Sequence, residues 1–126
     1  MNAGDSIPEL RTTPDRFLTV RYAGASGDFN PIHLDAELAK AVGFPSNILH
    51  GLWSMAQVAR AAVEEGGGDP RSLKRLSVQF RGIGLPEQEI VVTATRGDGG
   101  LVELVAQQED RQIVKNAEAE LVNGVS

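Results

Sequence analysis

The chain has only two histidines, and one of them, His33, lies five residues after Asp28 in the stretch SGDFNPIHLD. Asn30 and Pro31 separate the two side chains, and a residue before proline is held extended. The spacing is too short for two separate elements, so both side chains can face one small volume. A carboxylate and an imidazole that share a water form a general acid–base pair. Such a pair suits the addition of water to a carbon next to a carbonyl group, or its removal.

The same chemistry needs a place for the negative charge that develops on the carbonyl oxygen. The stretch ILHG, residues 48–51, opens a long helical window. Gly51 would present a bare backbone N–H at the positive end of that helix, which makes it the candidate oxyanion donor. The alternative is that Gly51 only lets the chain turn tightly into the helix.

The first half of the chain is predicted to be helical and to place these residues on loops and helix ends. A helix is expected from an N-cap at Thr13 to about Gly24, followed by an irregular loop over 26–31 in which Asn30 hydrogen-bonds the backbone. A short helix is expected over 35–43 and a long one over 51–65, ending at a glycine connector. One apolar face of the long helix is expected to pack on a sheet; it consists of Leu52, Met55, Ala56, Ala59 and Val63.

Beyond Pro70 the hydrophobic period changes to two, which indicates strands over 76–81, 90–95, 101–108 and 113–121. The short connections between them favour antiparallel pairing. Helices first and strands afterwards predict an α+β fold with one long helix packed on a curled antiparallel sheet. Exposed sheet edges favour a dimer that extends the sheet.

The composition predicts a single soluble domain spanning residues 1–126. Hydrophobic residues make up 41% of the 126 residues, charged residues 23%, and no apolar run approaches a membrane span. The N-terminus shows no secretion signal, and the absence of cysteine excludes disulfides and thiolate chemistry, so we expect a cytoplasmic protein.

The charge balance argues against a nucleic-acid surface, because the formal net charge is −5 and aromatic residues are few. One local exception is the basic segment 71–81, which carries four positive charges and no acid. The favoured interpretation is a solvated strand face. The alternative is a contact with the phosphates of a ligand or with an acidic carrier protein.

The stretch YAGASGDFNPIHLD, followed by AxxxGF and by ILHG at the mouth of a helix, resembles the hydratase motif of MaoC-like dehydratases and (R)-specific enoyl-CoA hydratases. The resemblance covers residues 21–62 and implies a hotdog fold, an antiparallel sheet wrapped around one long central helix. It matches Asp28 and His33 to the catalytic pair, Asn30 to the motif asparagine and Gly51 to the oxyanion glycine.

The resemblance implies a hydro-lyase without a cofactor, which hydrates trans-2-enoyl thioesters or dehydrates (3R)-hydroxyacyl thioesters of coenzyme A or acyl carrier protein. It also implies a homodimer or a heterodimer with a second hotdog subunit. His50, Trp53 and Ser54 are expected to bind substrate or support the site. Trp53 and Ala59 depart from the family pattern, which leaves the length of the acyl chain open.

Several other functions are weighed against this one. A metal site would recruit Asp28, His33, Asp35 and His50, but their spacing fits no common metal signature, so we predict none. A Ser54–His50 hydrolytic pair lacks a nucleophile elbow. A hotdog thioesterase would place its carboxylate on the long helix, which has no acid before Glu64. A catalytic subunit that is inactive without its partner, and a non-catalytic binding subunit, are the remaining alternatives.

Overall fold

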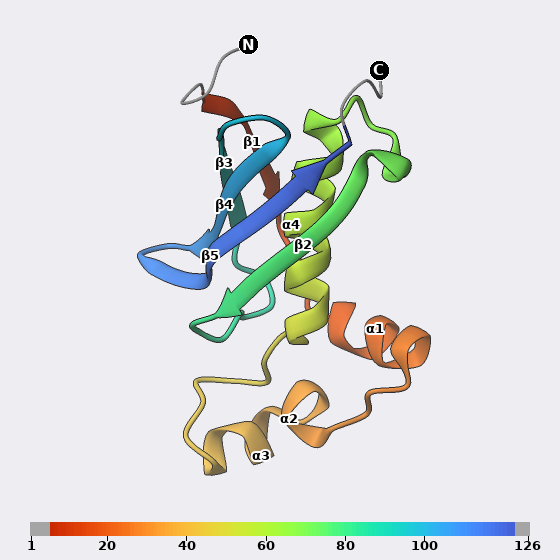
Figure 1. The fold of residues 1–126 in the computed structure, drawn as a ribbon. Helices are drawn as coiled ribbons and strands as arrows, with labels where there is room; N and C mark the ends of the chain where they lie inside the picture. The colour runs from red at the N-terminus through yellow and green to blue at the C-terminus, as the bar shows by residue number, and fades with distance from the viewer. Residues whose placement is uncertain (1–5, 123–126) are drawn as a thin grey trace.

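The computed structural model describes residues 6–122, which form a five-stranded antiparallel sheet and four helices (Figure 1). The strand order in the sheet is β1-β3-β4-β5-β2, so β1 and β2 are the two edges. The elements are β1 Ser6–Thr12, α1 Leu18–Ser26, α2 Pro31–Leu34, α3 Ala36–Ala41, α4 Gly51–Glu65, a 3-10 turn at Pro70–Ser72, β2 Leu73–Phe80, β3 Ile90–Arg96, β4 Leu101–Gln108 and β5 Arg111–Leu121. The α+β architecture predicted from the sequence is confirmed.

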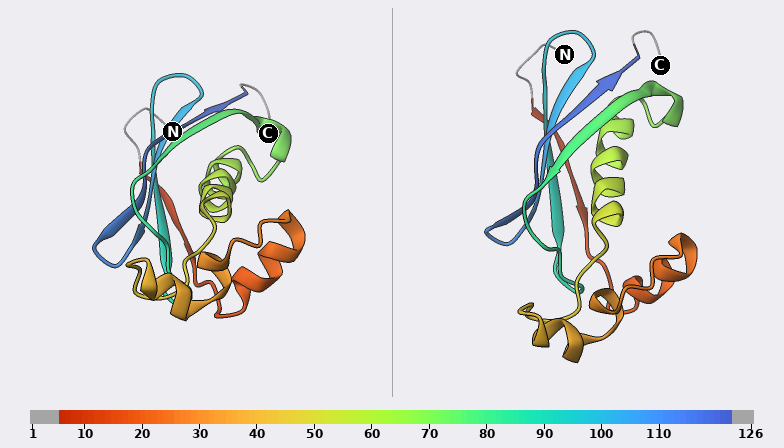
Figure 2. Two further views of the ribbon diagram at one scale, coloured as in Figure 1. Left: turned by 90° about the horizontal axis from the view of Figure 1, so that it is seen from below. Right: turned by 60° about the horizontal axis from the view of Figure 1, so that its bottom comes forward.

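Helix α4 lies in the hollow of the curved sheet, and α1, α2 and α3 gather beneath its N-terminal end (Figure 2). The core forms between the concave face of the sheet and one side of α4. Its buried residues include Val58, Ile90, Leu104 and Ile113. This arrangement presents the first turn of α4 to the short helices that precede it in the chain.

The bounds of α4 agree with the prediction, but the predicted buried face is wrong. Leu52 is 64% exposed. The side that meets the sheet consists instead of Ser54, Gln57, Val58, Ala61 and Ala62. Each of the two sides contains two alanines and larger apolar groups, so the sequence pattern alone does not fix which side of α4 meets the sheet.

The prediction that helices come first and strands afterwards is also wrong, because β1 precedes them and pairs antiparallel with β3. The segment SIPELRT lacks a clean alternation of apolar and polar residues and contains Pro8. The pairing is irregular between Ile7 and Leu10, around this proline. Proline is tolerated at an edge strand because its missing N–H costs no internal ladder bond.

Helix α1 begins at Leu18 rather than after Thr13. The Asp15 carboxylate accepts a hydrogen bond from the Phe17 N–H at 2.8 Å, and the Asp15 carbonyl accepts one from Leu18. The Pro14 carbonyl accepts a hydrogen bond from the backbone N–H of Glu87, in the loop before β3, and this bond connects the segment to the sheet. The helix continues past Gly24 and ends at Gly27, whose φ of 80° is the left-handed conformation that glycine adopts without strain.

The short helix after the loop is confirmed as α3. The Asp35 side chain caps it by accepting hydrogen bonds from the N–H groups of Glu37 and Leu38. Among the helices of residues 6–122, none is long and apolar enough to cross a membrane. The N-terminal residues 1–5, on which part of the expectation about secretion rested, lie outside the described residues.

Candidate active site

Asp28 lies in the loop between α1 and α2, where local hydrogen bonds hold it. Its N–H donates to the Ser26 hydroxyl and its carboxylate accepts from the Asn30 N–H, both at 3.2 Å. The Asn30 side chain in turn accepts from the Ile32 N–H and caps α2. The side chain of Asn30 therefore hydrogen-bonds a backbone group of this loop, as the sequence predicts. The Asp28 side chain stays 52% exposed, open to a ligand.

His33 projects from the capped helix α2 into the interior and is 7% exposed. Its Nδ1 lies 2.9 Å from the Ile48 carbonyl oxygen. A carbonyl oxygen only accepts, so Nδ1 carries the proton, and the Nε2 of the neutral ring has a free lone pair. That Nε2 lies 3.6 Å from Oδ2 of Asp28. The structure thus brings together the two side chains that the sequence predicts as a pair.

His50, the residue that caps α4, is 2% exposed and stacks on His33 with ring centroids 3.9 Å apart. Its Nε2 lies 3.0 Å from the Asp28 carbonyl oxygen and therefore donates to it. Its Nδ1 is buried without a partner among the described residues. The Tyr22 ring also lies near the His50 ring, with centroids 4.8 Å apart and an angle of 49° between the planes. His50 thereby links the Asp28 loop to the start of α4.

Two cavities open at this point. The outer one has a volume of about 300 Å³ and is lined by Tyr22, Ser26, Asp28, His50, Gly51, Leu52 and Phe80. The inner one has a volume of about 160 Å³ and is lined by His33, Ile48, Leu49, Gly51, Ser54, Phe80, Gly82, Ile83, Gly84 and Ile113. As the first residue of α4, Gly51 carries one of the helix N–H groups that have no acceptor within the helix.

Five of the seven predicted site residues line these cavities, whereas Asn30 and Trp53 line neither. Trp53 is half-buried and packs against the core. Ser54 lines the inner cavity, but neither ring nitrogen of His50 bonds its hydroxyl, which removes the hydrolytic pair. Sequence reasoning missed Tyr22 and Phe80. Tyr22 opens the quoted motif, whereas Phe80 belongs to a strand pattern that carries no chemical signal.

One atom each from Asp28, His33 and His50 lies within 4.8 Å of the others, a separation that a metal ion could bridge. The rings do not fit one, because they stack with an angle of 20° between their planes. The lone pairs of imidazole nitrogens lie in the ring plane, and stacked rings direct them side by side rather than toward one point. One nitrogen of each ring also donates to a carbonyl. The geometry suits proton transfer better than metal binding.

Cations of the basic segment 71–81 are mostly paired with acids. Arg71 contacts Asp69 at 2.8 Å, and Lys74 and Arg75 contact Glu120 and Glu118 on β5. These ion pairs are exposed, which agrees with the interpretation of a solvated strand face.

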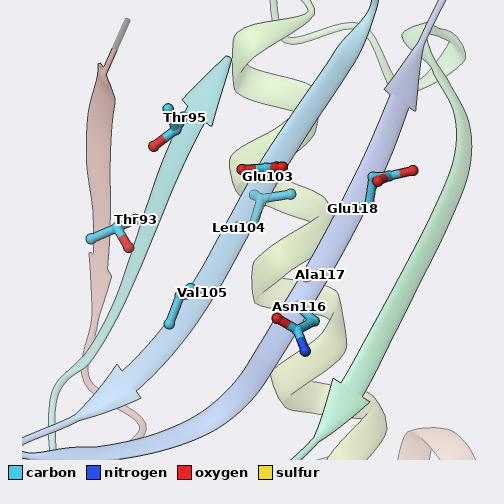
Figure 3. Close-up of a pocket in the computed structure, with 8 residues that line it drawn as sticks. All are labelled: Thr93, Thr95, Glu103, Leu104, Val105, Asn116, Ala117 and Glu118. Atoms are coloured by element: carbon cyan, nitrogen blue, oxygen red, sulfur yellow. The ribbon is translucent and has the colours of Figure 1, made fainter. Parts of the chain in front are cut away.

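A larger hollow of about 410 Å³ lies on the outer face of the sheet (Figure 3). Thr93, Thr95, Glu103, Asn116 and Glu118 line it and point away from α4. Glu103 and Glu118 are partners across β4 and β5, so like charges face each other. This hollow contains no histidine, and the sheet separates it from α4, so the chemistry belongs to the two cavities at Gly51.

The fold is that of a hotdog domain, with Asp28 and His33 brought together beside the N-terminal end of its central helix. A family model described as the MaoC like domain matches residues 5–120. The chain therefore belongs to the MaoC-like domain family, which confirms the resemblance read from the motif.

Known relatives agree with this assignment. The chain is 37% identical over 87 residues to the peroxisomal enoyl-CoA hydratase 2 of Arabidopsis thaliana, covering 68% of this chain and 27% of that protein. It matches a MaoC-like dehydratase of Phytophthora capsici with a TM-score of 0.86 and 31% identity, over 96% of this chain and 43% of the other. The ChsH1–ChsH2 complex of Mycobacterium tuberculosis shares the fold, with a TM-score of 0.80 and 23% identity, over 95% of this chain and 96% of that one. The chain thus spans less than half the length of the first two.

Proposed function

We propose that the protein is a hydro-lyase that reversibly adds water to trans-2-enoyl thioesters and gives (3R)-hydroxyacyl thioesters. The observation that carries the proposal is the approach of His33 Nε2 to within 3.6 Å of the Asp28 carboxylate, beside the first turn of α4. The relative named enoyl-CoA hydratase 2 supports the same reaction class.

In the proposed hydration, the thioester carbonyl accepts a hydrogen bond from the Gly51 N–H. This bond strengthens as negative charge develops on the carbonyl oxygen. A water held by Asp28 and His33 loses one proton to the pair while its oxygen bonds to C3. The pair then delivers a proton to C2. Dehydration runs the same steps backwards, and no cofactor is required. Because the two groups act as a coupled pair, the proposal assigns the proton transfers to both together.

The position of the acids on α4 argues against thioester hydrolysis. Glu64 and Glu65 lie at the C-terminal end of α4, about 20 Å along the helix axis from Gly51. Glu65 also forms a buried ion pair with Arg96 of β3. A carboxylate at that end cannot reach a thioester bound at Gly51, so the hydratase is the better-supported function.

We further propose that the chain works beside a second hotdog subunit, either its own copy or a different chain. Two edge strands and the exposed side of α4, with Leu52 at 64% exposure, are surfaces that a partner would cover. The ChsH1–ChsH2 complex supports such an assembly for this fold. A mass of about twice 13.4 kDa by light scattering would support the homodimer, and a monomer would favour the heterodimer.

The carrier, the compartment and the domain boundaries remain predictions from the sequence. Coenzyme A is the carrier in the name of the Arabidopsis relative, and acyl carrier protein is the alternative. That relative is named peroxisomal, so the predicted cytoplasmic location has no support from it. We retain one domain over residues 1–126 as a proposal.

The test measures the loss of the conjugated enoyl-thioester absorbance when trans-2-enoyl-CoA substrates are added. Asp28→Asn and His33→Ala are each expected to lower kcat by about 10²- to 10⁴-fold, the usual contribution of general acid–base catalysis. Asp110→Asn, at an exposed turn between β4 and β5, is the matched control and should retain full activity. Circular dichroism checks that all variants fold. Full activity of Asp28→Asn or His33→Ala would refute the proposal.

A further inference from the structure

The outer and inner cavities have only two lining residues in common, Gly51 and Phe80. The acid–base pair is divided between them, because Asp28 lines the outer cavity and His33 the inner one. His33 Nε2 and Asp28 Oδ2 lie 3.6 Å apart, so a substrate held by both groups lies where the two cavities adjoin. Gly51 and Phe80 line both cavities, and we call the space beside these two residues the passage.

The two cavities differ in chemistry in a way that orients such a substrate. The outer cavity carries polar groups, including the Tyr22 hydroxyl, the Ser26 hydroxyl and Asp28. The inner cavity is lined mainly by apolar side chains, among them Ile48, Ile83 and Ile113. The polar thioester and its carrier fit the outer cavity, and the hydrocarbon tail fits the inner one.

The Phe80 ring borders the passage beside Gly51. A Cβ atom added to Gly51 would lie 3.4 Å from Cε1 of Phe80, in van der Waals contact with the ring. Phe80 is the last residue of the edge strand β2, and its side chain is 51% exposed. Nothing in the sheet ladder requires an aromatic residue there. A methyl group added at Gly51 would therefore touch the ring.

We propose that Phe80 is a specificity-determining residue that sets the width of this passage and so admits slender, unbranched acyl tails. The inner cavity, with a volume of about 160 Å³ and a mainly apolar lining, takes the tail of a straight-chain enoyl thioester. This inference rests on the proposed hydratase function.

The test compares trans-2-octenoyl-CoA with cinnamoyl-CoA, whose rigid phenyl group begins at C3. The wild type is expected to prefer the octenoyl substrate. Phe80→Ala should lower the ratio of the two kcat/KM values by about tenfold or more. Phe17→Ala, which removes a phenyl ring of similar exposure that lines neither cavity, should leave the ratio within about twofold.

A second variant narrows the passage without removing the proposed oxyanion donor. Gly51→Ala keeps its backbone N–H and adds a methyl group against the ring, so it should lower octenoyl-CoA turnover by about tenfold or more. The double variant Gly51→Ala/Phe80→Ala should recover most of that loss. An unchanged ratio in Phe80→Ala, or no recovery in the double variant, would overturn the inference while leaving the hydratase proposal intact.

Failure of the hydratase proposal itself would give a different result: the folded wild type would turn over neither substrate. The passage is then tested by binding, with calorimetry of octanoyl-CoA and 3-phenylpropanoyl-CoA, which do not react. Phe80→Ala should strengthen binding of the phenyl ligand relative to the octanoyl ligand. Equal relative affinities in wild type and variant, or no binding of either ligand, would overturn the role of Phe80.

Discussion

Two backbone carbonyls hold the stacked imidazoles of His33 and His50 in opposite tautomers. The Ile48 carbonyl accepts from Nδ1 of His33, and the Asp28 carbonyl accepts from Nε2 of His50. Only His33 therefore directs a free nitrogen toward the Asp28 carboxylate. We infer that His50 acts through the other two residues, by fixing the loop that carries Asp28 and the plane of the His33 ring.

This positioning role predicts different kcat values for two replacements of His50. His50→Phe keeps a ring to stack on His33 but removes the donor to the Asp28 carbonyl, whereas His50→Gln keeps a donor. We expect kcat to fall by about 10²-fold in His50→Phe, with KM within about threefold, because a small misplacement of the carboxylate affects the chemical step more than binding.

His50→Gln should recover part of the lost kcat, measured with the same enoyl-thioester assay and with thermal melting as a check on folding. A merely structural role would lower thermal stability in both variants and leave kcat per folded protein unchanged. That result would contradict the positioning role.

At the scale of elements, α4 buries one side against the sheet and leaves the side with Leu52 exposed. Ala62 is fully buried in the contact, whereas Ala56 on the other side is exposed. The close approach of α4 to the sheet depends on this division. It also places Gly51 at the end of the sheet where β2 finishes at Phe80.

Ala62→Leu is therefore expected to lower the free energy of unfolding by about 1–3 kcal/mol, because three added carbons overpack a buried contact. Ala41→Leu, the same change at an exposed position of α3, should change it by about 0.5 kcal/mol or less. Urea denaturation with a linear extrapolation measures both. An equal loss in the two variants would contradict the close packing of Ala62.

At the scale of the whole molecule, exposed ion pairs join distant parts of the chain and affect its response to acid. Arg21 hydrogen-bonds the Asp15 carboxylate and lowers its pKa below the ordinary 3.8. Hydrogen bonding to Lys74 lowers the pKa of Glu120 below its ordinary 4.5 and fastens β2 to β5. A carboxyl group whose pKa is lower in the folded state stabilises the fold above its ordinary pKa and loses that contribution as pH falls through the folded value.

We therefore expect the free energy of unfolding to change little near about pH 6 and to decrease as the pH is lowered past about 4.5. The midpoint of urea denaturation measures this change. Glu120→Gln should reduce the size of this fall, and added salt should reduce it further because the pairs are exposed. A urea midpoint that does not change between about pH 6 and about pH 3 would contradict this account.

The features that the sequence alone determined are those governed by residues close together in the chain. The bounds of α4, the Asp35 cap of α3 and the order of Asp28, Asn30 and His33 depend on contacts within a few residues. The motif of residues 22–35, with ILHG, was sufficient to identify the family.

Only the tertiary structure decided which surfaces meet. It placed β1 beside β3 and buried the side of α4 that carries Val58, and it brought Phe80 beside Gly51 from a strand far along the chain. It also stacked His50 on His33, which no spacing in the sequence predicts. Periodicity reports that a helix has an apolar face, but the depth and direction of burial depend on the partner surface, which is assembled from segments distant in the sequence.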